Sequence, residues 1–323
     1  MADGYYAYID GTTYDAVNSM NYGFVVDIAV VSGSGSKSYS YAGFTLTAFL
    51  VGGAVTQGTA QKSGTVTISG QTVSWSGVEG TVPKLVVYAN ANATLKYDGF
   101  VYNDYTKNPP VMKLAPPFTP LALTQVIDLT PGYGQVLQTS VPYGAAFIAF
   151  HRSTASSGFD HVIWDEINQN GFWSLRFRPA IDGSIAMGPC RIYVFSKTLV
   201  NTPAAGFFMY LDGQIVWHNN CLPLEMVVGG KSGQSTPVAI TAGASVLVNI
   251  PYDPTYPIQG QARYNCYSAG INTQGLYEAS GGDIYAAREY KTTGGAPPSS
   301  SMGPPASINT SVYDTYYRQA LGV

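Results

Sequence analysis

The side chains best suited to acid–base or metal chemistry lie in one stretch of the chain, between residues 151 and 166. Histidine and carboxylate groups can exchange protons, and the same groups bind divalent metal ions. In a strand, however, Asp165 and Glu166 point to opposite faces, and His161 shares its face with Asp165 only. Glycoside hydrolysis needs two carboxyl groups that face one bond, usually from separate strands. We therefore interpret the stretch as solvated strand ends and a loop; its candidates are His151, Asp160, His161, Asp165 and Glu166.

Two further motifs invite a chemical interpretation, and both favour a structural one. Gly230-Lys231-Ser232 matches the end of a phosphate-binding loop, but such a loop needs Gly where Glu225 stands and a helix afterwards. Gly233 and Pro237 follow instead, which indicates a loop. His218 follows a predicted strand, a position typical of a hairpin end. Neither a Gly-x-Ser-x-Gly nor a His-Glu-x-x-His motif occurs. The sequence therefore predicts a non-enzyme with no catalytic residue, no metal site and no cofactor.

The cysteines do not form a recognisable framework. Cys190, Cys221 and Cys266 are odd in number and far apart, and none belongs to the Cys-x-x-Cys pair of a zinc site. Free, largely buried thiols are the expected state. We therefore expect synthesis in a reducing cytoplasm.

The charge content argues against two classes of partner. Charged residues make up 11% of the 323 residues, against about 25% in average proteins. The net charge of −3 leaves no basic surface to neutralise phosphates, so nucleic acid is not expected as a partner. No apolar run approaches the roughly 20 residues of a membrane span, so membrane insertion is not expected. Residues 1–5 lack a basic segment followed by an apolar one, so we expect no secretory signal.

Tyrosine is abundant, with 25 residues, and it gathers near both ends of the chain. Tyr is enriched at protein interfaces because its ring is apolar and its hydroxyl tolerates water. A surface poor in charge and rich in Ser, Thr, Asn and Tyr suits packing against a partner. Glycan contact and packing within one domain remain alternatives. The interface candidates are Tyr5, Tyr6, Tyr8, Tyr14, Trp217, Tyr313, Tyr316 and Tyr317.

The elements that must position these residues are strands. Gly (36 residues) and Pro (20 residues) are frequent, whereas good helix formers are scarce. The clearest local pattern is a hairpin across Gly70-Gln71, a pair suited to a type II′ turn. This turn pairs Ile68 with Val73 and Val66 with Trp75. Residues 311–321 are compatible with either a short helix or an extended arm.

Asp-Gly, which favours a type I′ turn, recurs between apolar runs. At Asp212-Gly213 the expected partners are Tyr210 with Ile215 and Phe208 with Trp217. At Asp98-Gly99 they are Tyr97 with Phe100 and Leu95 with Tyr102. Turns are also expected at Asp10-Gly11 and Asp182-Gly183.

Pro-rich and Gly-rich breaks divide the chain into three parts, 1–115, 116–236 and 237–323. Each of the first two contains an apolar strand, an Asp-Gly hairpin and a Pro-containing strand, so we interpret 116–236 as a duplicate of 1–115. A weaker copy of this strand and hairpin pattern lies around Gly281-Gly282. The predicted fold is all-β: tandem small antiparallel β-sandwich or open-barrel domains, with a β-hairpin region and an extended Pro/Gly/Ser-rich C-terminal segment in 237–323.

The repeated unit resembles tail- and fibre-associated β-rich structural proteins of tailed bacteriophages. The resemblance rests on Arg191–Phe195 and Phe207–Val227, with a fainter match at Lys84–Leu114. It implies a non-enzymatic virion protein of the tail, tail tip or fibre, made in the bacterial cytoplasm. The implied partners are copies of itself, a trimer being one arrangement considered, and other virion proteins.

Two alternatives come from other functional classes. One is a receptor-binding module that recognises host-surface glycan or protein through loops 32–40, 52–64 and 152–158. The less favoured one is a surface glycan depolymerase that uses carboxylates such as Asp160, Asp165 or Glu166. Fold resemblance does not decide between these functions.

Overall fold

The computed structural model describes residues 6–16, 23–41, 44–51, 64–78, 83–91, 97–98, 101–104, 111–114, 121–132, 135–160, 164–177, 188–211, 213–241, 247–249, 262–287 and 305–323. The all-β prediction is confirmed, since these residues form small antiparallel sheets and a single α-helix. No helix among them is long and apolar enough to cross a membrane.

The first β-sandwich covers the N-terminal third of the chain. One sheet has the strand order β1-β6-β3 and the other β2-β5-β4. Leu46, Leu85 and Val87 of the first sheet pack against Val73 and Val78 of the second, so the two sheets share a core. The strands are β1 (Gly23–Val30), β2 (Gly33–Ser38), β3 (Phe44–Val51), β4 (Thr65–Ser69), β5 (Thr72–Val78) and β6 (Lys84–Ala91).

The second sandwich repeats this plan. Its sheets have the orders β10-β16-β12 and β11-β15-β14, and its core lies between them around Phe147, Trp173 and Ile192. The short β13 (Gly158–Phe159) follows β12. The other strands are β10 (Ala122–Leu129), β11 (Val136–Pro142), β12 (Phe147–Ser153), β14 (Trp164–Gln169), β15 (Phe172–Phe177) and β16 (Cys190–Ser196).

A third set of strands has the same connections. Its sheets have the orders β19-β25-β21 and β20-β24-β23, and β22 pairs with β23. Edge pairing of β12 with β21 joins it to the second sandwich in one six-stranded sheet. The strands are β19 (Val227–Val228), β20 (Lys231–Gln234), β21 (Val238–Thr241), β22 (Leu247–Asn249), β23 (Ala262–Ile271), β24 (Tyr277–Ala287) and β25 (Ala306–Asn309).

If the short strands β13 and β22 are left out of the numbering, the first, sixth and third strands of each sandwich form one sheet, and the second, fifth and fourth form the other. The first two sandwiches also share an irregularity near the start of the first strand, between Val25 and Asp27 and between Leu123 and Gln125. The third set begins at Val227, ahead of the boundary placed between 236 and 237. The division into domains stays a prediction. The weaker copy at Gly281-Gly282 lies within β24 rather than at a turn.

One central core joins the three sandwiches. Successive side chains of a strand point to opposite faces. On β16, Ile192 and Val194 face the second sandwich's own core, whereas Tyr193 and Phe195 face the central core. On β6 of the first sandwich, Val86 likewise faces the central core, whereas Leu85 and Val87 face the core of that sandwich. These strands are apolar on both faces because both faces are buried.

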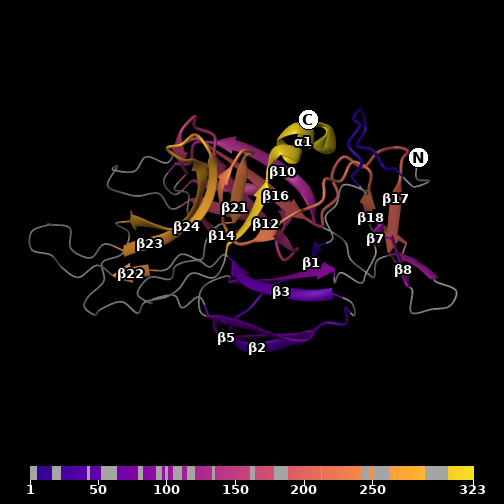
Figure 1. Cartoon of the computed structure of the whole chain (residues 1–323), viewed down its shortest axis with the longest axis horizontal. Coiled ribbons are helices and arrows are strands. Elements are labelled where there is room, and N and C mark those ends of the chain that lie inside the picture. Colours follow the sequence, from indigo (N-terminus) through magenta and orange to yellow (C-terminus); the bar gives the residue numbers. More distant parts are fainter. Residues whose placement is uncertain are drawn as a thin grey trace, which may run out of the picture.

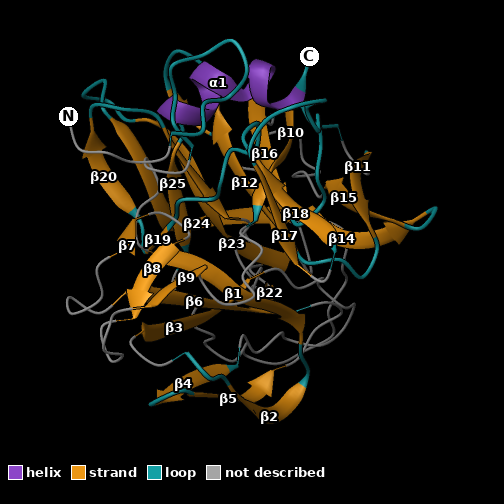
Figure 2. Cartoon of the chain, turned by 90° about the vertical axis from the view of Figure 1, so that its right-hand side faces the viewer, coloured by secondary structure: helices purple, strands orange, loops and turns teal. Residues whose placement is uncertain are grey.

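The chain ends also cover the central core. Helix α1 (Ser311–Leu321) packs beside β10, and residues 6–16 form a small loop closed by a Tyr8–Asp15 bridge. Both views place α1 at one end of the molecule and the sheet of β2, β5 and β4 at the opposite end (Figure 1, Figure 2). The alternative between helix and arm at 311–321 is thus decided for a helix.

The hairpin predictions were right in part. The Gly70 turn is confirmed, with a positive φ at Gly70 and the expected pairs Ile68–Val73 and Val66–Trp75. Between β17 (Phe208–Leu211) and β18 (Gln214–His218), Tyr210 pairs with Ile215 as expected, but a register shift pairs Trp217 with Met209 instead of Phe208.

The Asp98-Gly99 register was wrong. Between β7 (Tyr97–Asp98) and β8 (Val101–Asp104), Tyr97 pairs with Tyr102 and Asp98 with Val101; β9 (Val111–Leu114) completes the sheet. Gly11 has the positive φ of a turn residue, as expected. Asp182-Gly183 and most of the Pro/Gly/Ser-rich C-terminal segment lie outside the described residues. The sequence analysis missed Asn170-Gly171, where both φ angles are positive and the turn joins β14 to β15.

Candidate functional site

Three of the acid–base candidates, His151, Asp160 and Glu166, are buried, not solvated. His151 Nδ1 is hydrogen-bonded to Asp160 Oδ2, and both side chains are fully buried. Asp160 Oδ1 also accepts a 2.8 Å hydrogen bond from the backbone N–H of Ala269 on β23. The pair therefore holds the second sandwich against the third. The expectation of solvent exposure was wrong, because the fold places β12 between two other strands.

Glu166 takes part in a separate buried contact. Its carboxylate lies 2.7 Å from the Lys84 ammonium, and the two side chains are 5% and 2% exposed. Lys84 belongs to the first sandwich, so this ion pair joins the first sandwich to the second. The structure therefore brings His151 and Asp160 together but leaves Glu166 with another partner. His161 and the side chain of Asp165 lie outside the described residues.

The remaining reactive groups are also inside the molecule. Burial lowers the pKa of His218, which favours the neutral ring. Cys190 and Cys221 are free and buried, and burial raises the pKa of both thiols, so the reactive thiolate is disfavoured. Lys231 and Ser232 lie on strand β20, not in the loop that was expected, and no helix follows them, so a phosphate-binding loop is absent from this segment. Among the described residues, no three His, Cys, Asp or Glu side chains group closely enough to hold a metal ion.

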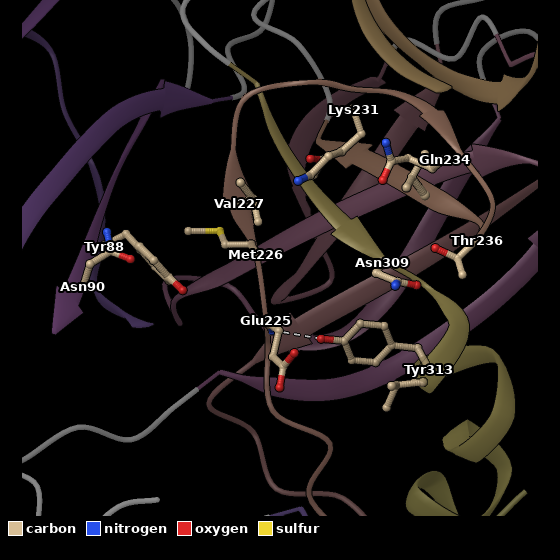
Figure 3. Close-up of a pocket in the computed structure, with 13 residues that line it drawn as sticks. Tyr88, Asn90, Glu225, Met226, Val227, Lys231, Gln234, Thr236, Asn309 and Tyr313 are labelled. Carbon is tan, nitrogen blue, oxygen red and sulfur yellow. Dashed lines mark hydrogen bonds between the residues drawn. The ribbon is translucent and has the colours of Figure 1, made fainter. Parts of the chain in front are cut away.

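A pocket of about 440 Å³ lies where the first sandwich, the third sandwich and α1 meet (Figure 3). Small-molecule sites usually have volumes of about 300–1,000 Å³. Strand β6 supplies one wall, and α1 with the segment from 225 to 238 supplies the others. The lining residues are Tyr88, Asn90, Glu225, Met226, Val227, Lys231, Gln234, Thr236, Val238, Ser307, Asn309, Val312 and Tyr313.

Two tyrosines define the inner part of this pocket. The Tyr313 hydroxyl donates to the carbonyl of Pro223 (2.9 Å) and accepts from the N–H of Glu225 (2.8 Å), so its ring is fixed. The Tyr88 side chain is 6% exposed; its hydroxyl has no hydrogen bond to a described residue, and its oxygen opens onto the pocket rather than being sealed in the core. Burial, and then the nearby charge of Glu225, raise the pKa of Tyr88, so its hydroxyl stays protonated.

The polar groups around the rim keep hydrogen-bonding capacity. Gln234 donates its Nε2 to the carbonyl of Ser232, which leaves the Gln234 amide oxygen as an acceptor. Asn309 Oδ1 accepts from the N–H of Ser311, which leaves the Asn309 amide NH₂. The pocket holds one carboxylate, on Glu225, and one ammonium, on Lys231.

Sequence reasoning missed this pocket because its walls come from distant segments. Tyr88 and Asn90 precede Glu225 by well over 100 residues, and Tyr313 follows it by a further 88. Tyr88 and Asn90 alternate along β6 as side chains on one face of any strand do, so the local pattern does not mark them. The one local hint was the Lys231 motif, which pointed to a phosphate loop.

The interface candidates divide into exposed and buried residues. Tyr6 and Tyr8 are 57% and 47% exposed, and their rings stack with centroids 6.2 Å apart. Trp217 and Tyr313 are 1% and 2% exposed in the central core, so neither ring is open to a partner. Tyr14, Tyr316 and Tyr317 pack partly against that core, and Tyr5 lies outside the described residues.

The segments expected as recognition loops agree with the structure only in part. Most of 32–40 is strand β2, whereas 154–157 form a largely exposed loop between β12 and β13; residues 52–63 lie outside the described residues. Comparisons with protein-family models, with curated proteins and with solved structures found no match to this chain.

Proposed function

We propose that this chain is a non-enzymatic structural protein that joins a larger assembly, the tail, tail tip or fibre of a tailed phage. The observation that carries the proposal is the use of its reactive side chains. His151–Asp160 and Lys84–Glu166 are buried pairs between sandwiches, where no substrate reaches them. Groups that could do acid–base chemistry therefore serve to hold the architecture together.

The exposed Tyr6–Tyr8 pair is the proposed contact with a partner. Replacing both residues by Ser should weaken self-association of the purified chain at least about tenfold, because aromatic anchors dominate interface energies. Sedimentation velocity over a concentration series measures this. Tyr210, which is 60% exposed on β17, provides the matched control: Tyr210→Ser should leave association unchanged.

Mass spectrometry of purified particles tests the place of the chain in an assembly. The proposal expects the chain in virions at a fixed ratio to the other structural proteins. A stable monomer at every concentration, together with its absence from particles, would contradict it.

A second candidate function is recognition of a host-surface molecule, in keeping with the receptor-binding alternative. The pocket between β6, the third sandwich and α1 favours it, because a protein with only packing roles does not need an open polar cavity. Adsorption of the purified chain to intact host cells tests this candidate directly.

A further inference from the structure

From the pocket geometry we infer that it binds a neutral polyhydroxylated ligand, a saccharide unit, with the Tyr88 hydroxyl as a central hydrogen-bond donor. The inference deepens the second candidate function, host-surface recognition, and it does not depend on the assembly role. It rests on three features of the pocket: a tyrosine hydroxyl that opens onto it, a balance of charge, and a mixed polar and apolar lining.

The Tyr88 hydroxyl is the first feature. It has no hydrogen bond to a described residue and opens onto the pocket, so it can donate to a bound ligand. Figure 3 shows the Tyr88 ring directed into the pocket, on the side of Glu225 and Met226. A ligand hydroxyl placed there would accept from the phenol and donate to a neighbouring oxygen, which satisfies both groups.

The charges of the lining are the second feature. Glu225 and Lys231 contribute one negative and one positive group, so the pocket carries no net charge from its lining. An anion site usually concentrates Arg, Lys or several backbone N–H groups. The balance here favours a neutral ligand.

The third feature is the combination of amides and apolar surface. The free amide NH₂ of Asn309 and the amide oxygen of Gln234 provide a donor and an acceptor, as adjacent sugar hydroxyls require. Met226, Val227 and Val312 provide apolar surface for the C–H face of a sugar ring. A saccharide unit has both kinds of surface.

Saturation-transfer NMR and calorimetry on the purified full chain test the inference. The probes are glucose, galactose, mannose and N-acetylglucosamine, with inorganic phosphate as the anionic comparison. We expect saturable binding of at least one sugar, with little change between about 50 and 300 mM NaCl, a range over which added salt increasingly screens charge–charge interactions.

Tyr88→Phe is the decisive variant. It keeps the ring and removes a hydroxyl without an internal partner, so the unfolding midpoint in urea should not fall. Sugar affinity should fall roughly tenfold, the effect of one lost hydrogen bond. Tyr143→Phe, at an exposed site outside the pocket, should change neither quantity.

Three outcomes would overturn the inference. One is the lack of saturable binding by any of the four sugars, even if the chain adsorbs to host cells, a result that leaves the recognition function standing. Another is equal sugar affinity in Tyr88→Phe and the unmodified chain. The third is binding of phosphate alone that weakens with salt and is lost in Lys231→Gln, which would assign the pocket to anions.

Discussion

Replacing Glu166 by Gln should destabilise the fold by about 3–5 kcal/mol, the usual cost of removing one partner from a buried ion pair. The variant leaves the Lys84 ammonium buried without its counter-charge. Lys84 would keep its 3.0 Å hydrogen bond to the Phe147 carbonyl and its position 3.7 Å from the Phe147 ring centroid. These contacts are weaker than a carboxylate at 2.7 Å. Urea unfolding at pH 7, followed by tryptophan fluorescence, measures the loss.

The loss of stability in Glu166→Gln should change with pH in a defined direction. Burial lowers the pKa of Lys84 below its ordinary 10.5, and Glu166 opposes that shift. Between the folded-state pKa and 10.5 the unfolded chain binds more protons, so stability rises with pH in that window. Without Glu166 the folded-state pKa of Lys84 falls further, so the pH range in which stability rises extends to lower pH. The stability difference between Glu166→Gln and the unmodified chain should therefore shrink as pH rises from 7 to 10.

Two controls distinguish the effect of leaving a buried charge unpaired from the effect of removing any charge. Asp128 pairs with Arg191 at 2.6 Å but is 55% exposed, so Asp128→Asn should cost about 1 kcal/mol or less. The double variant Lys84→Met with Glu166→Leu should be more stable than either single charge removal, because no unpaired charge remains. A Glu166→Gln variant as stable as Asp128→Asn would contradict the structural role given to this ion pair.

Replacing Asp314 by Asn should release helix α1 from the central core, at a cost of about 3 kcal/mol. The Asp314 carboxylate accepts from Arg191 (2.8 Å), Arg152 (3.0 Å) and the Tyr193 hydroxyl (2.6 Å). It also accepts from Thr310 at 2.8 Å, at the start of the helix. An amide cannot accept from all these donors, and it leaves Arg152 without the carboxylate it pairs with, whereas Arg191 keeps Asp128. Hydrogen exchange of the amides in 311–321 measures the release.

Acid should release α1 from the unmodified chain as well. Burial by itself raises the pKa of Asp314, but hydrogen bonds from Tyr193 and the charges of Arg152 and Arg191 outweigh it and lower the pKa below 3.8. Because the pKa of Asp314 is lower in the folded chain, its ionised carboxylate stabilises the fold fully above the pKa of the unfolded chain, about 3.9. This stabilisation is lost as the pH falls through the folded-state pKa. The difference in exchange between Asp314→Asn and the unmodified chain should therefore vanish below that value.

Thr315→Ala provides the matched control on the same helix. Thr315 is exposed and its hydroxyl bonds only the carbonyl of Ser311, so its replacement should change stability by about 0.5 kcal/mol or less. Protection of 311–321 that is unchanged in Asp314→Asn would show that packing of Tyr313, and not the carboxylate, holds the helix.

The sequence by itself determined the class of fold and much of the local geometry. Strand alternation and turn residues act between near neighbours, so the Gly70 hairpin and the Tyr210–Ile215 pair could be predicted. Where a register shift intervenes, as before Trp217, the prediction was off by one residue, because a bulge depends on packing against the rest of the molecule.

Only the tertiary structure decided how the polar residues are used. His151 and Asp160 are nine residues apart and meet, but their burial comes from the third sandwich. Lys84 and Glu166 are ion-paired across two sandwiches, and Tyr88 reaches Glu225 and Tyr313 only after three segments assemble. Burial, charge pairing and pocket formation depend on contacts between residues remote in sequence, and alternation within a strand carries no information about which strand will lie opposite.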